Sequence, residues 1–174
     1  MSKGLVHFVH GKESGPHGTK IAALSTVARR HGWDVASLDY SHTVDPALRA
    51  QQLRSACAGL EQPLILVGSS MGGWVAAEAS VRVDAYGVFL LAPALYMPGY
   101  PTQAPPLLAD HTAIVHGWDD DVIPCEHSIR YARLQRCTLH LVQDGHRLER
   151  KLDTLCQLFD AFMARCEHPA SASS

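Results

Sequence analysis

One short stretch, residues 64–73, restricts the fold of this chain more than any other. It reads Leu-Ile-Leu-Val-Gly-Ser-Ser-Met-Gly-Gly, and an Ala-rich segment of helical character follows it. An apolar run that enters a helix through Gly68-x-Ser70-x-Gly72 is typical of a strand that turns sharply into a helix, because the turn squeezes both flanking residues together. Such a turn strains the serine backbone and exposes the hydroxyl above the end of the sheet. The stretch therefore predicts a strand, a tight turn and a helix in direct succession.

The register of this pattern selects Ser70 as the candidate nucleophile. Ser69 would need glycines at the two positions where the chain has Val67 and Met71. The alternative interpretation is an ordinary Gly- and Ser-rich loop after a strand. Five residues alone leave both interpretations open, because short motifs often match by chance. The loops at the other strand ends must decide between them.

Length and composition favour a single globular domain. The chain has 174 residues, of which 47% are apolar and 18% charged, and we expect one domain over residues 1–166 and a disordered tail over 167–174. A net charge of −2 gives no basic excess, so we expect no nucleic-acid partner. No apolar run is long enough to span a bilayer, and the N-terminus lacks the apolar core of a signal peptide. We therefore expect no stable membrane insertion and a cytoplasmic location.

The cysteines and histidines do not form a metal-binding or disulfide pattern. Five cysteines are an odd number, and no pair has the C-x-x-C spacing, which argues against a disulfide framework or a zinc ribbon and fits a reducing compartment. No H-E-x-x-H motif or close Cys/His ligand set occurs, so we predict neither a metal nor another cofactor. Cys125 lies in a loop close to the candidate site, and whether its thiol is reactive stays open.

Six apolar segments alternate with segments of helical periodicity along the chain. This alternation predicts an α/β fold, a three-layer sandwich with a mostly parallel six-stranded sheet and helices on both faces. The helix that opens at Pro46 is expected to place Leu53, Ala56, Cys57 and Leu60 on one face. The strands are predicted at 4–10, 34–40, 63–68, 85–91, 111–116 and 138–142. The helices are predicted at 17–30, from 46 onward, from the turn at Ser70 to 82, at 124–135 and at 147–166.

The loops after the fifth and sixth strands supply an acid and a base. A serine hydroxyl needs a neighbouring base, usually histidine, that a carboxylate holds in the right tautomer. The fifth-strand loop, residues 116–124, reads His-Gly-Trp-Asp-Asp-Asp-Val-Ile-Pro, and His146 follows the sixth strand. In hydrolases with the G-x-S-x-G turn the chain order is Ser, then the acid, then His. The order here is the same, but three consecutive aspartates compete for the role of the acid. His10 and His116 precede glycines in turns and are interpreted as structural.

These motifs resemble those of the α/β-hydrolase superfamily over residues 4–165. His-Gly-x-x-Asp-x-x-Ile-Pro is similar to the acid loop of that superfamily, and the resemblance assigns the acid to Asp120. His-Gly-Lys at 10–12 resembles the segment that supplies one of the two oxyanion-binding amides, which would be that of Lys12, with Glu13 as the alternative. The other amide belongs to the residue after the nucleophile, Met71. No cap domain interrupts the segment after the fourth strand, so the chain looks like a small, lidless esterase or thioesterase.

The sequence thus predicts a serine hydrolase that cleaves carboxylic esters or thioesters of a small-molecule or acyl substrate. Ser70 would form the acyl-enzyme, with His146 as general base and Asp120 orienting the imidazole. Two alternatives stay open: a non-catalytic interaction module on the same fold, and an amidase, transacylase or carbon–carbon bond hydrolase with the same triad. Several apolar and aromatic side chains are candidates for the walls of a substrate pocket, although packing within a surface loop would explain their presence equally well. They are Tyr96, Met97, Tyr100, Leu107, Leu108 and Trp118.

Overall fold

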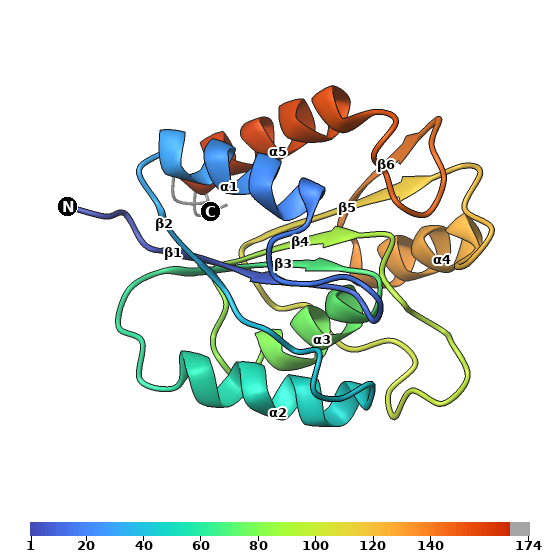
Figure 1. Cartoon of the computed structure of the whole chain (residues 1–174), viewed down its shortest axis with the longest axis horizontal. Helices are drawn as coiled ribbons and strands as arrows, with labels where there is room; N and C mark the ends of the chain where they lie inside the picture. The colour runs from blue at the N-terminus through green and yellow to red at the C-terminus, as the bar shows by residue number, and fades with distance from the viewer. Residues whose placement is uncertain (168–174) are drawn as a thin grey trace, which may run out of the picture.

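Six parallel strands in the spatial order β2-β1-β3-β4-β5-β6 form the central sheet (Figure 1). The computed structural model describes residues 1–167, so nearly all of the predicted tail lies outside the described residues. Within residues 1–167 no cap domain interrupts the fold, and the predicted six-stranded parallel sheet is confirmed. The strands are β1 (Leu5–Val9), β2 (Asp34–Ser37), β3 (Leu64–Ser69), β4 (Gly87–Leu91), β5 (His111–Gly117) and β6 (Thr138–Val142).

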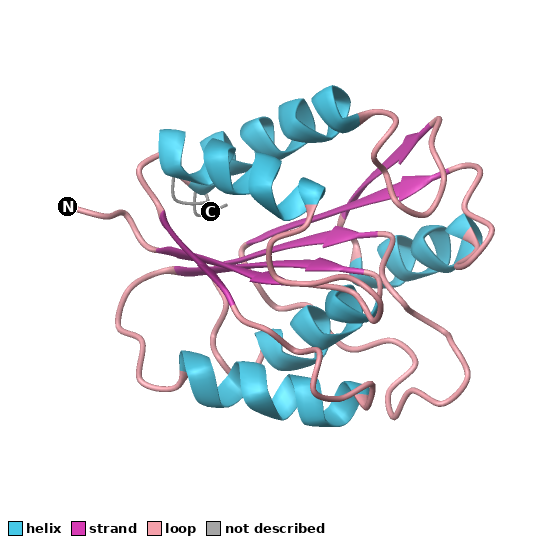
Figure 2. Ribbon diagram, viewed as in Figure 1, coloured by secondary structure: helices cyan, strands magenta, loops and turns pink. Residues whose placement is uncertain are grey.

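Helices cover both faces of the sheet, as the alternating pattern predicts. Figures 1 and 2 show α1 and α5 on one face of the sheet and α2, α3 and α4 on the other. Because both faces are covered, the central strands β3 and β4 are buried almost throughout, which explains their continuous apolar sequence. The helices are α1 (Thr19–Arg30), α2 (Pro46–Cys57), α3 (Met71–Ser80), α4 (Cys125–Gln135) and α5 (Leu152–Cys166).

Each face of the sheet has its own apolar core. Between the sheet and α5, the ring of Phe89 packs on those of Phe159 and Phe162, with centroids 5.0 and 5.1 Å apart. On the opposite face, Trp74 of α3 is 1% exposed and packs in a cluster with Leu53 of α2. Burial of side chains of this size stabilises a fold by about 1.5–3 kcal/mol each. The two cores fix the sheet, and with it the position of every strand end.

The prediction for the buried face of α2 is wrong in part. The helix ends at Cys57 because Ala58 is extended, so Leu60 lies beyond the helix and is 37% exposed. Ala56 is also exposed. The buried stripe instead contains Arg49 at 0% exposure. Apolar periodicity does not identify such a stripe, because one of its members is charged.

The last helix begins five residues later than the predicted start at residue 147. The buried carboxylate of Asp144 accepts hydrogen bonds from the amides of Gly145 (2.7 Å) and Lys151 (2.9 Å). These bonds close a turn that precedes α5, and Leu148 within it has a positive φ of 55°. The helical periodicity of residues 147–151 therefore belongs to a turn that Asp144 organises.

The turn between β3 and α3 brings three backbone segments into contact. A Cβ atom on Gly68 would fall on the carbonyl of Gly72, and a Cβ on Gly72 would fall on the carbonyl of Val9. No side chain fits at either position, because the obstructing atoms are backbone. The absence of a side chain at Gly72 therefore lets the end of β1 lie directly against the first turn of α3.

We expect Gly72→Ala to lower the free energy of unfolding by roughly 2 kcal/mol or more, because the added methyl group overlaps the backbone of β1. Gly15→Ala is the matched control, since a Cβ there meets nothing within 4 Å, and it should change the free energy of unfolding by less than about 0.5 kcal/mol. Denaturant unfolding of both variants measures the difference. Equal stability of the two variants would contradict the close approach of β1 and α3.

Candidate active site

Ser70 has the strained backbone conformation that the sequence pattern predicts. Its φ and ψ angles are 56° and −118°, which a non-glycine residue rarely adopts. The surrounding backbone holds this conformation: the Ser70 amide donates to the Leu91 carbonyl at 2.9 Å, and the Ser70 carbonyl accepts from the amide of Ala94 at 2.9 Å. The side chain consequently projects from the carboxyl end of β3 into the pocket.

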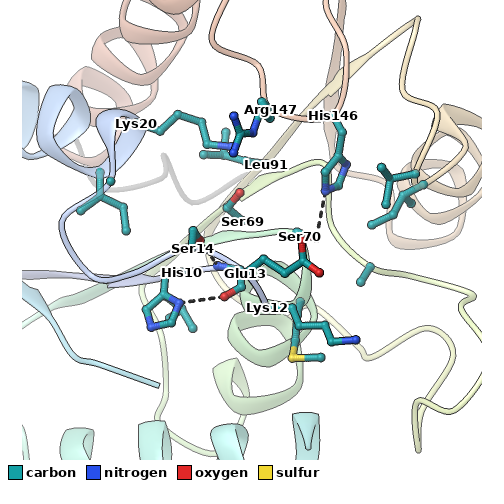
Figure 3. A pocket seen from close by; sticks show the side chains of 18 of the residues that line it. His10, Lys12, Glu13, Ser14, Lys20, Ser69, Ser70, Leu91, His146 and Arg147 are labelled. Carbon is teal, nitrogen blue, oxygen red and sulfur yellow. Dashed lines mark hydrogen bonds between the residues drawn. The ribbon is translucent and has the colours of Figure 1, made fainter. Parts of the chain in front are cut away.

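The structure brings together the side chains of Ser70, His146 and Asp120. His146 Nε2 lies 3.1 Å from Ser70 Oγ, and His146 Nδ1 lies 2.8 Å from Asp120 Oδ2 (Figure 3 shows the first contact). An ionised carboxylate only accepts hydrogen bonds, so the ring proton resides on Nδ1 and Nε2 accepts from the serine hydroxyl. This tautomer can take up the serine proton, which is the first step of nucleophilic catalysis by serine.

Of the three consecutive aspartates, only Asp120 is buried. Its side chain has 0% exposure, whereas that of Asp119 is 61% exposed and lies near Arg150, and Asp121 is exposed. Asp120 Oδ1 accepts from the amides of Val122 (2.9 Å) and Ile123 (2.8 Å). Burial alone would raise the pKa of the Asp120 carboxyl, but the side-chain and backbone hydrogen bonds outweigh it and hold this pKa well below its ordinary value.

A second histidine, His116, supports the same carboxylate. It is fully buried, and its Nε2 lies 2.9 Å from both Asp120 Oδ2 and the carbonyl of Ile123. Both partners are acceptors, so Nε2 carries the proton, and Nδ1 accepts from the Ser128 hydroxyl at 2.7 Å. His116 therefore has the structural role that the sequence suggests, but its contact with the carboxylate has no signal in the sequence.

Asp144 ties the loop of the acid to the loop of the histidine. Its carbonyl accepts from the Asp119 amide at 3.0 Å, and a Cβ on Gly117 would fall on that same carbonyl. Together with the bonds of its carboxylate to the turn before α5, these contacts fix His146 relative to Asp120. The role of Asp144 has no clear signal in the sequence, where its only distinguishing feature is its position before a Gly-His pair.

Two backbone amides near Ser70 have no acceptor in the described part of the chain. Met71 is the first residue of α3, so its N–H has no partner within the helix. The amide of Lys12 likewise donates to no group among residues 1–167, and Lys12 and Glu13 both line the pocket beside Ser70. Gly11 packs against the turn, since a Cβ there would lie 3.4 Å from the Ser70 Cβ. The binding of an oxyanion by the amides of Met71 and Lys12, and the choice of Lys12 over Glu13, stay predictions.

A pocket of about 620 Å³ opens beside Ser70 at the carboxyl ends of the strands. Of the predicted wall residues, Met97 and Tyr100 line it, whereas Tyr96 and Trp118 do not. The Tyr96 ring instead lies 4.1 Å from the guanidinium of Arg130, and Trp118 is 55% exposed. Leu107 and Leu108 also lie outside the pocket. Another wall of the pocket was not predicted from the sequence. It is formed by α1, the loop before α2 and the first residue of α2, which contribute Lys20, Ile21, Leu24, Val44 and Pro46.

Cationic side chains gather on one side of this pocket. Lys20 of α1 and Arg147 both line it, and Figure 3 shows the ends of the two side chains turned toward one another. Neither forms an ion pair with a carboxylate among residues 1–167. Burial lowers the pKa of Lys20; the Glu149 carboxylate acts in the opposite direction, and the charge of Arg147 lowers this pKa by a smaller amount. This side of the pocket is thus partly desolvated and holds two unpaired cations.

Cys125 does not have the surroundings of a reactive thiol. It is 5% exposed, and burial together with the carboxylate of Glu126 raises the pKa of its thiol. Within residues 1–167 no group of three or more His, Cys, Asp or Glu side chains could hold a metal ion. No helix in this part of the chain has the length and apolar character needed to cross a membrane.

Residues 8–171 match the Alpha/beta hydrolase family, so the chain belongs to this family. Among solved structures, it is 31% identical to a protein from Xanthomonas campestris pv. campestris assigned to the hydrolases of the alpha/beta superfamily; the match covers 95% of this chain and 99% of that one, with a TM-score of 0.84. Est1E from Butyrivibrio proteoclasticus is 18% identical, with 95% and 89% of the two chains covered and a TM-score of 0.81.

A third similar structure is a serine hydrolase without a lid, also from Xanthomonas campestris. It is 15% identical, the match covers 98% of this chain and 84% of that one, and the TM-score is 0.79. The likeness to this protein and to Est1E bears on the fold alone. No curated protein sequence matches the chain.

Asp120→Asn should make the free energy of unfolding less dependent on pH in the acidic range. Because the pKa of Asp120 in the folded state lies below the ordinary value of about 3.9, its carboxylate stabilises the fold above about pH 4, and this contribution disappears as the pH falls through the lowered pKa. The wild type should therefore be more stable than the variant at pH 7, and the difference should shrink below about pH 4. Denaturant unfolding across this range measures it.

Asp119→Asn is the control, because the Asp119 side chain is largely exposed, and it should have a small effect at every pH. A difference between the wild type and Asp120→Asn that stays constant from about pH 7 to pH 3 would show that the carboxylate is not stabilised in the folded state.

Proposed function

We propose that this protein is a serine hydrolase that cleaves carboxylic esters or thioesters through an acyl-enzyme on Ser70. The observation that carries the proposal is the continuous hydrogen-bond chain from Ser70 Oγ through His146 to the buried carboxylate of Asp120. Membership of the Alpha/beta hydrolase family supports hydrolysis as the reaction class. The ester or thioester specificity is inferred from the small, uncapped site.

The proposed reaction uses only groups of this chain and water. His146 Nε2 accepts the Ser70 proton as Oγ attacks the acyl carbon, and Asp120 stabilises the imidazolium that forms. The amides of Met71 and Lys12 donate to the oxyanion. His146 then protonates the leaving alcohol or thiol, and it accepts a proton from the water that hydrolyses the acyl-enzyme. No cofactor takes part in these steps.

An interaction module without catalysis explains the site less well. Docking of a partner would require neither the strained backbone at Ser70, which lowers stability unless other contacts offset it, nor a hydrogen-bond chain from Ser70 through His146 to Asp120. An amidase, a transacylase or a carbon–carbon bond hydrolase would use the same triad. Ester hydrolysis remains the proposal because it makes the smallest demand on the leaving group.

Replacement of Ser70 by Ala should abolish labelling by an active-site fluorophosphonate and lower ester hydrolysis by roughly 10⁴-fold or more. The matched control is Ser69→Ala, which removes the neighbouring hydroxyl and should retain labelling. Mass spectrometry of the labelled protein and a nitrophenyl ester assay measure the two effects. A wild-type protein that no fluorophosphonate labels would favour the interaction module.

We propose further that the preferred acyl group carries a negative charge at its far end. Apolar side chains such as Ile21, Leu24 and Met97 line the pocket and can accept an alkyl chain. Lys20 and Arg147 lie on one side and form no ion pair within residues 1–167, so a substrate carboxylate could pair with both. The carboxylates of Glu13 and Glu149 also line the pocket and oppose this attraction, so the preference for an anionic acyl group is expected to be modest.

Nitrophenyl esters of equal acyl length that end in a carboxylate or in a methyl group test this preference. We expect kcat/KM to be about fivefold higher for the carboxylate, because an exposed or partly buried ion pair contributes up to about 1 kcal/mol, and we expect high salt to reduce the preference. Lys20→Met combined with Arg147→Gln should remove it, while Arg82→Gln on the remote surface should not. If both the wild type and the double variant prefer the neutral ester, the proposed preference for an anionic acyl group is wrong. The proposal that the protein hydrolyses esters would be unaffected.

A further inference from the structure

Arg49 lies fully buried behind the loop that follows β1. Its Nη1 donates to the carbonyls of Gly11 at 3.0 Å and of His10 at 3.5 Å, and its Nε donates to the carbonyl of Thr43 at 2.7 Å. The side chain has 0% exposure, and its Nη2 has no hydrogen-bond partner among the described residues. A guanidinium on α2 thus holds a loop that is 38 residues away in sequence.

The charge of Arg49 has no carboxylate partner among residues 1–167. Asp39 is an acidic group whose charge acts on Arg49, but its side chain is 65% exposed and accepts from the Ser41 amide. Burial lowers the pKa of Arg49, and the charges of Tyr100, Asp39 and Tyr40 oppose this effect. The guanidinium nevertheless keeps its proton, as arginine does throughout proteins. A buried cation without a counter-ion destabilises the folded state. Folding alone therefore does not explain why a cation lies here.

The peptide group between Gly11 and Lys12 receives two hydrogen bonds on its carbonyl side. His10 Nε2 accepts from the Tyr40 amide at 2.9 Å, so the His10 proton is on Nδ1, which donates to the Gly11 carbonyl at 2.8 Å. Figure 3 shows the His10 ring turned toward this loop. Arg49 is the second donor to that carbonyl, and it is the charged one.

These two bonds determine the direction of the Lys12 amide. Residues 1–167 contain no cis peptide bond, and in a trans peptide the C=O and the N–H point in opposite directions. Because the Gly11 carbonyl points toward Arg49 and His10, the Lys12 N–H points away from them, on the side where Lys12 lines the pocket with Ser70. A charged donor on the carbonyl also withdraws electron density from the peptide and makes its N–H a stronger donor.

We infer that Arg49 is a positioning residue of the oxyanion hole, which aims the Lys12 amide at the oxyanion and places an uncompensated positive charge behind it. The inference rests on the proposed acyl-enzyme mechanism. Negative charge develops on the substrate oxygen only as the tetrahedral intermediate forms, so the Arg49 charge favours the transition state over the bound substrate. A role in packing alone would need the shape of the side chain but not its charge.

Arg49→Gln tests this inference, since it keeps a polar side chain but removes the charge and the fork of donors. We expect kcat to fall by about 10- to 100-fold with KM changed by less than about threefold, somewhat below the effect of deleting a direct oxyanion donor. A trifluoromethyl ketone, which forms an oxyanion on Ser70, should lose affinity by the same factor as kcat/KM. The alcohol of the same shape, which cannot form an oxyanion, should bind with unchanged affinity.

Arg54→Gln on the same helix is the matched control and should leave all three quantities unchanged. Arg49→Lys keeps the charge but reaches fewer carbonyls, and it should restore part of the loss in kcat. If Arg49→Gln does not fold, the same comparison is made with Arg49→Lys, for which kcat and ketone affinity should fall together by about three- to tenfold.

A folded Arg49→Gln protein with kcat within about twofold of wild type would overturn the inference. Equal loss of affinity for the ketone and for the alcohol would also overturn it, because that result indicates a general disruption of the pocket. For Arg49→Lys, a fall in kcat that the ketone affinity does not share, or an equal loss of affinity for the alcohol, has the same meaning. Failure of the proposed function is distinguishable, because the wild-type protein would then neither hydrolyse esters nor react with a fluorophosphonate.

Discussion

The contact of α3 with the end of β1 sets the position of every other group in the site. The Val9 carbonyl occupies the space that a side chain at Gly72 would fill, and the backbone of Gly72 occupies the space that a side chain at Gly68 would fill. Ser70 reaches the pocket only because this turn is so tight. β1 and β3 are neighbours at the point where the strand order reverses, which is where crevices open in parallel sheets. One backbone contact therefore places the serine and the β1 loop in a single crevice.

Two buried ions of opposite sign contact different parts of the site, and their environments differ. The Asp120 carboxylate is satisfied by two backbone amides and two histidines, whereas Arg49 has an unpaired nitrogen and no carboxylate partner among the described residues. In the proposed reaction, positive charge develops on His146 next to Asp120, and negative charge develops on the substrate near the amide that Arg49 supports. The fixed charges are therefore oriented to stabilise the charge separation of the transition state, and they are in place before the substrate binds.

The parts of the site that the sequence reveals are those in which a local constraint forces a residue type. The turn at Ser70 requires glycines at fixed spacing, and each strand end follows an apolar run, so the parallel sheet and the three side chains at its edge were predictable. Arg49 and Asp144 were not, because their roles depend on carbonyls and amides that only the tertiary structure brings near. For the same reason the start of α5 was predicted too early: helical periodicity continues through a turn that the Asp144 carboxylate holds in another conformation.

The pocket was the least predictable element, since its walls come from segments with no common sequence signal. Aromatic residues after β4 and β5 suggested a wall, and Tyr100 belongs to it, but Tyr96 packs on Arg130 and Trp118 is 55% exposed. The first turn of α1 contributes another part of the wall, and there Lys20 occupies a position where a cation opposes the helix dipole and is partly desolvated. Neither effect favours folding. Binding of the proposed anionic acyl group would reduce both costs, which is why the position of Lys20 fits that proposal.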